Sequence, residues 1–220
     1  MNLLNQVFYL IQKDLLLEWR QKYAFNGILL YVISTVFVVY LAFMEIEDMA
    51  WMTLFWIIML FASVNAVAKS FLQESPDRQL YYYTLVSPEA IILSKMIYNV
   101  LLLLLLGGLA LGVYSVLLGY PVEDTSLFLT TVALGAVGFA LCFTLISAIS
   151  SKASNNATLM PVLSFPVVIP ILSLLITLSK AAILGIEGDE NVEKDILVLL
   201  AIDGIMLVLS FILFPYLWRD

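Results

Sequence analysis

Asp203 is the only acidic residue that lies well inside one of the long apolar runs of this sequence. A carboxylate inside a membrane span is costly and often functional, so Asp203 is a candidate proton site or substrate contact. The alternative is structural: a carboxyl group beside Gly204 that is protonated or caps a helix, and is satisfied by a neighbouring helix. Because the chain has no histidine and its apolar runs contain no lysine, Asp203 would make a poor proton relay.

A second set of candidate functional residues, charged and aromatic, lies in the longest polar interruption of the sequence, from Lys69 to Lys95. It combines charges of both signs with three consecutive tyrosines and a Ser87-Pro88 break. We interpret it as a cytoplasmic surface on which an ATPase made as a separate chain docks. The alternative is an amphipathic connector that only rests on lipid headgroups. The predicted docking residues are Glu74, Asp77, Arg78, Gln79, Tyr82, Ser87, Pro88 and Glu89.

The local pattern of this interruption predicts a helix, a break and a second helix. Pro76 and Asp77 suit the start of a short interfacial helix that ends near Leu85, because proline and acidic residues favour the first helical turn. Ser87 is the predicted N-cap of the next helix and Pro88 its first residue.

No nucleotide-binding or catalytic constellation accompanies these residues. The sequence contains no GxxxxGK[ST] loop, so energy from ATP would have to come from a partner. The absence of histidine excludes histidine-based acid–base chemistry and histidine ligation of a metal or haem by this chain. The single cysteine, Cys142, lies in an apolar run and is expected to be a small buried residue. We therefore expect a membrane subunit that is not itself an enzyme, and no basic run suggests nucleic acid as a partner.

The amino-acid composition predicts that the chain lies in a lipid bilayer. The chain has 220 residues, of which 63% are hydrophobic and 12% charged, whereas globular proteins average about 45–50% and about 25%. We predict an all-α membrane protein, because helices satisfy every backbone group inside lipid. The predicted spans are 25–44, 51–68, 96–118, 127–150, 159–178 and 196–217. They would form one permease domain over 1–220, with an interfacial helix at 1–23 and a cytoplasmic coupling segment at 69–95.

The distribution of basic residues predicts the orientation of these spans. A cytoplasmic N-terminus places eight of the ten Lys and Arg residues inside and leaves only Lys180 and Lys194 outside. The predicted outer loops are acidic instead, and an even number of spans puts both termini in the cytoplasm. Before the first span, apolar residues recur at helical spacing and predict an amphipathic helix on the inner interface: Leu4, Val7, Phe8, Ile11, Leu15 and Trp19.

Two further patterns concern the packing of the spans. Pro161, Pro166 and Pro170 all fall in the fifth predicted span and remove backbone hydrogen bonds, which predicts either a hinge or a static kink. Gly107, Gly108 and Gly112 permit close helix approach in the third span, where Gly108 and Gly112 form a GxxxG pattern, while the glycines of the fourth span give a weaker signal.

This layout is similar to a permease of the ABC-2 type. Two stretches resemble the haem exporter protein B (CcmB) family of cytochrome c maturation more narrowly: 74–95, with Gln79-Leu80, Ser87-Pro88 and the run Ala90 to Lys95, and the proline run 161–172. The resemblance implies an inner-membrane subunit of an ABC complex that exports haem or releases a haem-loaded chaperone. It implies three partners: a separate ATPase that carries the ATP, a haem-handling membrane protein with a tryptophan-rich motif, and a periplasmic haem chaperone. The transporter class implies two copies per complex, with haem held by the partner proteins.

Other functions fit the same architecture. One is an ABC-2 permease that exports a lipid, a glycan or a drug. Another is a membrane scaffold for assembly that transports nothing. A proton-coupled transporter would depend on Asp203.

Overall fold

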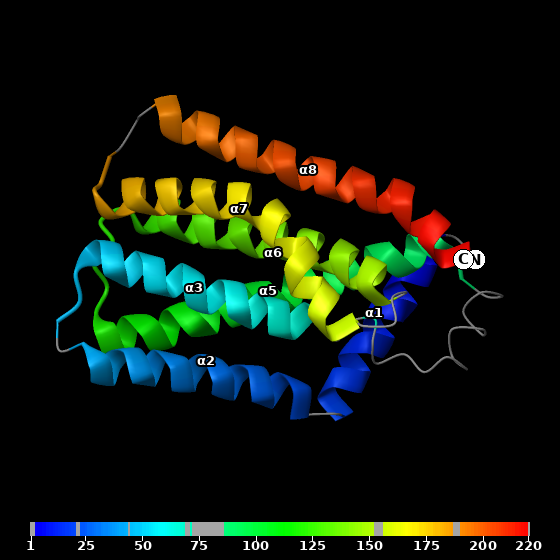
Figure 1. The fold of residues 1–220 in the computed structure, drawn as a ribbon, viewed down its shortest axis with the longest axis horizontal. Helices are drawn as coiled ribbons and strands as arrows, with labels where there is room; N and C mark the ends of the chain where they lie inside the picture. Colours follow the sequence, from blue (N-terminus) through cyan, green and yellow to red (C-terminus); the bar gives the residue numbers. More distant parts are fainter. Residues whose placement is uncertain are drawn as a thin grey trace.

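The computed structural model describes residues 3–20, 23–43, 45–68, 71, 86–151, 156–186 and 190–219. Within these ranges the secondary structure is entirely helical, which confirms the predicted all-α membrane fold. The helices are α1 (Leu3–Arg20), α2 (Tyr23–Ala42), α3 (Asp48–Val67), α5 (Pro88–Leu118), α6 (Thr125–Ser151), α7 (Asn156–Ile183) and α8 (Glu190–Arg219). The long helices lie side by side, and both chain ends lie at the same end of the bundle (Figure 1).

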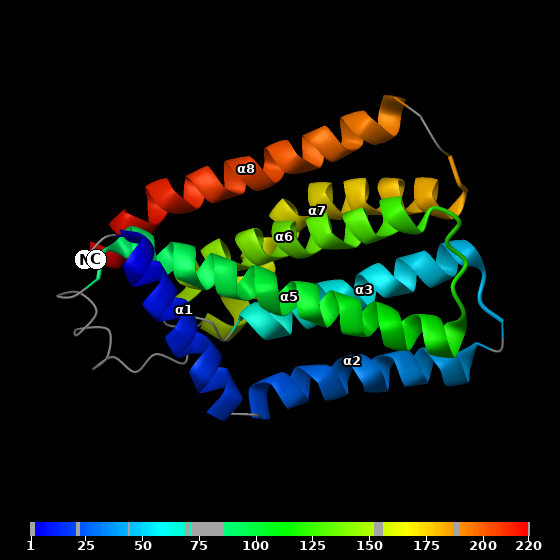
Figure 2. The ribbon, with the colours of Figure 1, turned by 180° about the vertical axis from the view of Figure 1, so that it is seen from behind.

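Five of the described helices, α3, α5, α6, α7 and α8, are long and apolar enough to cross a membrane. The first predicted span, 25–44, corresponds to α2, whose apolar part Asn26–Ala42 is shorter; α2 runs beside the other helices in both views (Figures 1 and 2). Helix α5 begins at Pro88, as the Ser-Pro-Glu pattern predicts, and its first eight residues precede the predicted membrane span, which starts at Met96. The last part of the predicted coupling segment, 88–95, is therefore the beginning of a membrane helix.

Helix α6 lies at the centre and packs on α3, α5, α7 and α8. Its glycines make this possible: a Cβ on Gly135 would lie 2.8 Å from the ring of Trp56, and a Cβ on Gly138 would lie 2.8 Å from Oδ1 of Asp203. In the third span, a Cβ on Gly107 would lie 3.2 Å from Cε of Met59, so helices approach closely there, whereas a Cβ on Gly108 or Gly112, the GxxxG pair, would meet none of the described residues within 4 Å. The packing of α6 depends on Gly135 and Gly138, because side chains from other helices lie directly against them.

Aromatic side chains hold together the end of the bundle opposite α1. The rings of Trp51 and Tyr114 are 4.9 Å apart, and Tyr114 Oη donates a hydrogen bond of 2.9 Å to the carbonyl of Trp51. Both side chains are 0% exposed. These two residues therefore stabilise the junction of α3 and α5, because buried polar tips find partners inside the protein.

Helix α1 crosses one end of the bundle obliquely and packs on α5 (Figure 2). Val7 and Leu10 are its buried apolar residues, while Leu4 and Phe8 are 70% and 65% exposed. The predicted amphipathic stripe is thus divided, with one part facing the bundle and the other facing outward. The side chain of Trp19, which belongs to the predicted stripe, lies outside the described residues.

Candidate functional site: the junction of α1 and α5

The first turn of α5 is fixed by the residues that the sequence assigned to it. Ser87 has extended backbone angles (φ −72°, ψ 145°), and its Oγ accepts a hydrogen bond from the N–H of Ala90 at 3.4 Å. Pro88 occupies the start of the helix and Glu89 lies in its first turn. The predicted N-cap is confirmed, because a serine oxygen here satisfies one of the free N–H groups that every helix start leaves.

Helix α1 reaches this cap through Gln6. Its Oε1 accepts hydrogen bonds from the Ser87 N–H at 3.2 Å and from Ser87 Oγ at 3.3 Å. The point where the coupling segment enters the membrane helix is therefore bound to α1. A displacement of this point would move both helices.

A buried ion pair lies two turns further along α5. Lys95 Nζ is 3.2 Å from Oδ2 of Asp14, and both side chains are less than a tenth exposed. The other carboxylate oxygen of Asp14 lies 3.1 Å from Nζ of Lys13. The Asp14 carboxylate thus lies between two ammonium groups, which compensates the cost of removing it from water.

A third contact completes the junction. Tyr98 Oη donates a hydrogen bond of 3.1 Å to Oε2 of Glu18. Gln6, Asp14 and Glu18 thus contact Ser87, Lys95 and Tyr98 in the same order along both helices. Three polar contacts spread along α1 therefore join it to the start of α5.

The other flank of the coupling segment is also attached to the bundle. Phe71 is 5% exposed, and its ring centroid lies 5.8 Å from that of Phe214 on α8. The carbonyl of Ala68, just after α3, accepts a hydrogen bond of 3.4 Å from Ser147 on α6. The described residues at this flank of the segment therefore contact α6 and α8.

Polar contacts also connect α5 to the central helix. Asn99, fully buried, donates a hydrogen bond of 2.8 Å from Nδ2 to Oγ1 of Thr144 on α6. One turn and a half before Thr144 on the same helix lies Gly138, against which Asp203 of α8 packs. A continuous set of contacts therefore runs from α1 through α5 and α6 to α8.

Asp203 occupies an unusual place in this set. Its side chain is 5% exposed, and in the described part of the chain neither carboxylate oxygen has a hydrogen-bond partner. Ile171 of α7 also approaches Gly138, so α6, α7 and α8 meet here. Asp203 is thus buried among the helices, as the sequence predicted for an acidic residue inside a span. The role of Asp203 stays a prediction.

The proline run lies in a bent helix. Helix α7 is assigned as continuous from Asn156 to Ile183, but its yellow N-terminal part turns away from the axis of the rest in both ribbon views (Figures 1 and 2). Pro166 and Pro170 are exposed, and Pro161 lies in the same part of α7. Proline has no backbone N–H group, so each proline removes one helical hydrogen bond, and this explains why α7 bends without being interrupted. The bend fits either a hinge or a static kink.

The structure brings only some predicted site residues together. Ser87, Pro88 and Glu89 share the first turn of α5, whereas Asp203 and the prolines lie in the bundle. The remaining predicted docking residues fall outside the described residues: Glu74, Asp77, Arg78, Gln79 and Tyr82.

Sequence reasoning missed Gln6, Asp14 and Lys95 as parts of this junction. A signal for Asp14 was available, because it follows Val7 by seven residues and Leu10 by four, and so continues the buried stripe of α1. A carboxylate on a buried stripe requires a partner, and Lys95 was the cation at the end of the facing segment.

The chain matches the family described as CcmB protein over residues 5–216. The chain belongs to the CcmB family. As a CcmB protein it is a membrane component of a haem exporter of the ABC transporter class, with the role of a permease subunit in cytochrome c biogenesis. Its apolar helices agree with a multi-pass membrane protein. No curated protein and no solved structure matches the chain significantly.

Proposed function

We propose that this CcmB protein couples ATP hydrolysis on a separate ATPase to the periplasmic side of the inner membrane. In this proposal the segment 69–95 receives the motion of the ATPase, and the helices transmit it across the bilayer. ATP is bound by the ATPase and haem by partner proteins, so the chain binds no cofactor directly. Both termini are cytoplasmic in this arrangement.

The observation that supports this proposal best is the attachment of the coupling segment at both described flanks. Phe71 packs on Phe214 of α8, and Ser87 is bound by Gln6 of α1. A segment tied to the bundle at both flanks transmits a displacement into several helices, whereas a connector resting on lipid needs no such ties.

The proposed assembly contains the partners that the family resemblance implies. They are the ATPase, a haem-handling membrane protein with a tryptophan-rich motif, and a periplasmic haem chaperone, with two copies of this chain per complex. A mechanical role suits the chain because it has no histidine, the most common protein ligand of haem iron. Release of the haem-loaded chaperone would then follow from movement of the helices, without haem bound by this chain.

A pull-down of the chain from native membranes in mild detergent tests this assembly. We expect an ABC ATPase and a tryptophan-motif haem protein to copurify, as identified by mass spectrometry. An ATPase without haem-handling partners would favour an ABC-2 exporter of a lipid, glycan or drug. Recovery of no ATPase would contradict the coupling role and favour an assembly scaffold.

Charge reversal in the coupling segment should weaken ATPase association. We expect the triple variant Glu74→Lys/Asp77→Lys/Arg78→Glu to recover about tenfold less ATPase than the wild type, because each reversal would place like charges opposite each other at the interface, which is unfavourable. Glu45→Lys, in the connection between α2 and α3 at the other end of the bundle, is the matched control. Undiminished association in the triple variant would show that these residues do not dock the ATPase.

Asp203→Asn separates mechanical coupling from proton coupling. We expect this variant to keep normal amounts of c-type cytochromes, measured by haem staining of membrane proteins, because asparagine preserves the shape of the side chain. Loss of c-type cytochromes with normal amounts of the variant in the membrane would favour a proton site at Asp203.

A further inference from the structure

Helix α8 is held to the bundle by a narrow stripe of side chains. Its buried residues recur every three or four positions: Leu199, Asp203, Met206, Ser210 and Phe214. Of the most apolar stretch of α8, 22% is buried inside the protein, compared with 78% for α6. Because the stripe is narrow and two of its residues are polar, the attachment of α8 depends strongly on how those two residues are satisfied.

The two polar residues of the stripe differ in their hydrogen bonding. Ser210 Oγ donates a hydrogen bond of 2.7 Å to the carbonyl of Met206 on its own helix. Asp203 is 5% exposed, and neither of its carboxylate oxygens has a hydrogen-bond partner among the described residues. An ionised carboxylate only accepts hydrogen bonds, so it cannot use a helix carbonyl as Ser210 does. A protonated carboxyl group can, because it carries one O–H donor.

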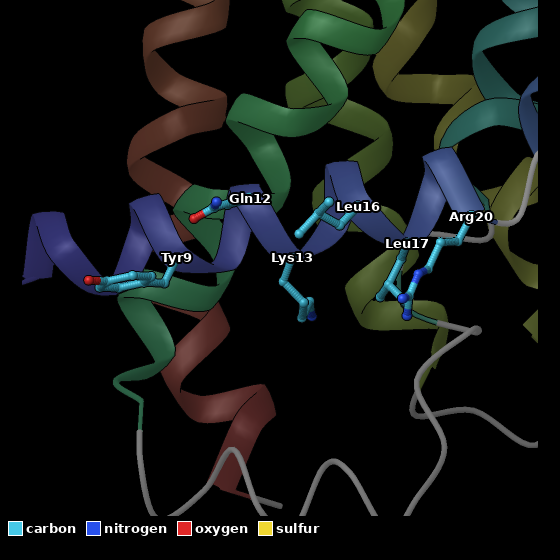
Figure 3. A pocket seen from close by; sticks show the side chains of 6 residues that line it. All are labelled: Tyr9, Gln12, Lys13, Leu16, Leu17 and Arg20. Carbon is cyan, nitrogen blue, oxygen red and sulfur yellow. The ribbon is translucent and has the colours of Figure 1, made fainter.

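None of the cations whose side chains the structure describes pairs with Asp203. Lys13 and Arg20 line the pocket on the surface of α1 (Figure 3), and Lys95 contacts Asp14. The two remaining lysines of the described part, Lys180 and Lys194, are exposed. An isolated carboxylate in an apolar interior is so costly that the group takes up a proton instead.

The titratable groups on the surrounding helices do not change this balance. On α6 the one titratable residue is Cys142, which follows Gly138 by one turn and interacts electrostatically with Asp203. Helix α7 carries only Lys180, nine residues after Ile171 and so about 13 Å further along the helix. On α8 itself the nearest is Asp195, eight residues earlier. The titratable residues of α5 lie toward its two ends: Glu89, Lys95, Tyr98 and Tyr114.

The packing of Asp203 on α6 leaves no room for its hydration. A Cβ on Gly138 would lie 2.8 Å from Oδ1 of Asp203, and Ile171 of α7 lies against the same glycine. Both carboxylate oxygens are buried. An ionised Asp203 needs water or a cation, which it can reach only if α8 moves away from α6. The ionisation of Asp203 is therefore coupled to the packing of α8.

We infer that Asp203 binds a proton and that this proton holds α8 against α6. With the proton bound, the neutral carboxyl group packs on Gly138. When the proton leaves, α8 separates from α6 so that the carboxylate becomes hydrated. Asp203 is thus a pH-sensitive latch on the last membrane helix and transfers no proton across the membrane. The inference does not depend on the proposed ATPase coupling, since it concerns this chain alone.

Thermal unfolding of the purified full-length chain in detergent tests for the bound proton. An exposed aspartate ionises above about pH 4, so above this pH the unfolded chain binds fewer protons than the folded chain. Stability should therefore fall as the pH rises, until Asp203 also ionises in the folded chain. Between about pH 5 and about pH 9, we expect the melting temperature to fall by several degrees more in the wild type than in Asp203→Asn.

Two further variants make this comparison specific. Asp195→Asn removes an acidic group from the same helix and should keep the pH dependence of the wild type. Asp203→Ala cannot bind a proton at this position and should be as insensitive to pH as Asp203→Asn. The same pH dependence in the wild type and in both Asp203 variants would overturn the inference.

Cys142 reports whether α8 moves. It is the single cysteine of the chain and is 0% exposed, so a thiol reagent such as dithiodipyridine reaches it only when the helices around it separate. The reaction rate of the wild type divided by that of Asp203→Asn cancels the pH dependence of the thiol itself. We expect this ratio to rise several-fold from about pH 5 to about pH 9. A constant ratio would show that α8 stays in place when the pH rises, and the latch would be wrong.

Discussion

Asp14→Leu is expected to destabilise the protein by about 3–5 kcal/mol, because breaking a buried ion pair by removing one partner is strongly destabilising. Lys95 would then lose the carboxylate 3.2 Å from its Nζ while remaining 7% exposed. Lys95→Met should destabilise less, since Asp14 keeps its contact with Lys13. The double variant Asp14→Leu/Lys95→Met should recover most of the loss, because buried pairs replaced by apolar residues are often neutral. Thermal unfolding in detergent measures the stability of the wild type, the two single variants and the double variant.

The chain provides its own control for this cycle. Lys194 and Glu190 form a pair at 3.4 Å whose side chains are 65% and 89% exposed. Glu190→Leu and Lys194→Met should change stability little, as exposed pairs contribute about 0–1 kcal/mol. If Asp14→Leu were no more destabilising than Glu190→Leu, the junction of α1 and α5 would not depend on this pair. Haem staining of c-type cytochromes in the stable double variant then measures whether the charges also serve coupling.

Gly138→Ala is expected to loosen the centre of the bundle. The new Cβ would lie 2.8 Å from Oδ1 of Asp203 and 3.4 Å from Cγ2 of Ile171. Asp203 has a short side chain and is 5% exposed, so it cannot move aside without displacing α8. Overpacking of this kind costs about 1–3 kcal/mol, and Gly138→Val should cost more. Thermal unfolding and the yield of c-type cytochromes are the measurements.

Gly112→Ala is the matched control, because a Cβ there meets nothing within 4 Å. Alanine is favoured over glycine in a helix by about 1 kcal/mol, so this variant should be neutral or slightly more stable. Asp203→Ala in the Gly138→Ala background should restore stability by removing the atoms that clash. The same melting temperature for Gly138→Ala and Gly112→Ala would contradict the close approach of α6 and α8.

Hydropathy predicted the membrane helices well because each span must satisfy a local requirement. A helix such as α6 needs enough apolar residues to cross lipid, and this property can be read within one stretch of sequence. The N-cap at Ser87 was predictable for the same reason, since Ser-Pro-Glu fits the start of a helix whatever its neighbours are. Hydropathy alone placed the start of the membrane span at Met96, eight residues after the start of α5 at Pro88, because Lys95, which pairs with Asp14, interrupts the apolar run.

Contacts between helices were predicted poorly, because they depend on which faces meet. Gly108 and Gly112 form the GxxxG motif, but a Cβ on either would meet none of the described residues within 4 Å. Gly138 instead lies against the carboxylate of Asp203, which is 65 residues further along the chain. The junction of α1 and α5 was missed likewise, since the sequence does not reveal that Gln6 lies beside Ser87. The docking residues from Glu74 to Tyr82 remain predictions.

The contacts of Gln6, Asp14 and Glu18 have a consequence for biosynthesis. These residues leave the ribosome well before Ser87, Lys95 and Tyr98, because chains are made from the N-terminus. Helix α1 must therefore remain at the membrane surface with its carboxylates hydrated until α5 has been inserted. Only then can Asp14 meet Lys95, so docking of α1 is a late step of assembly that marks a chain whose third membrane span is in place.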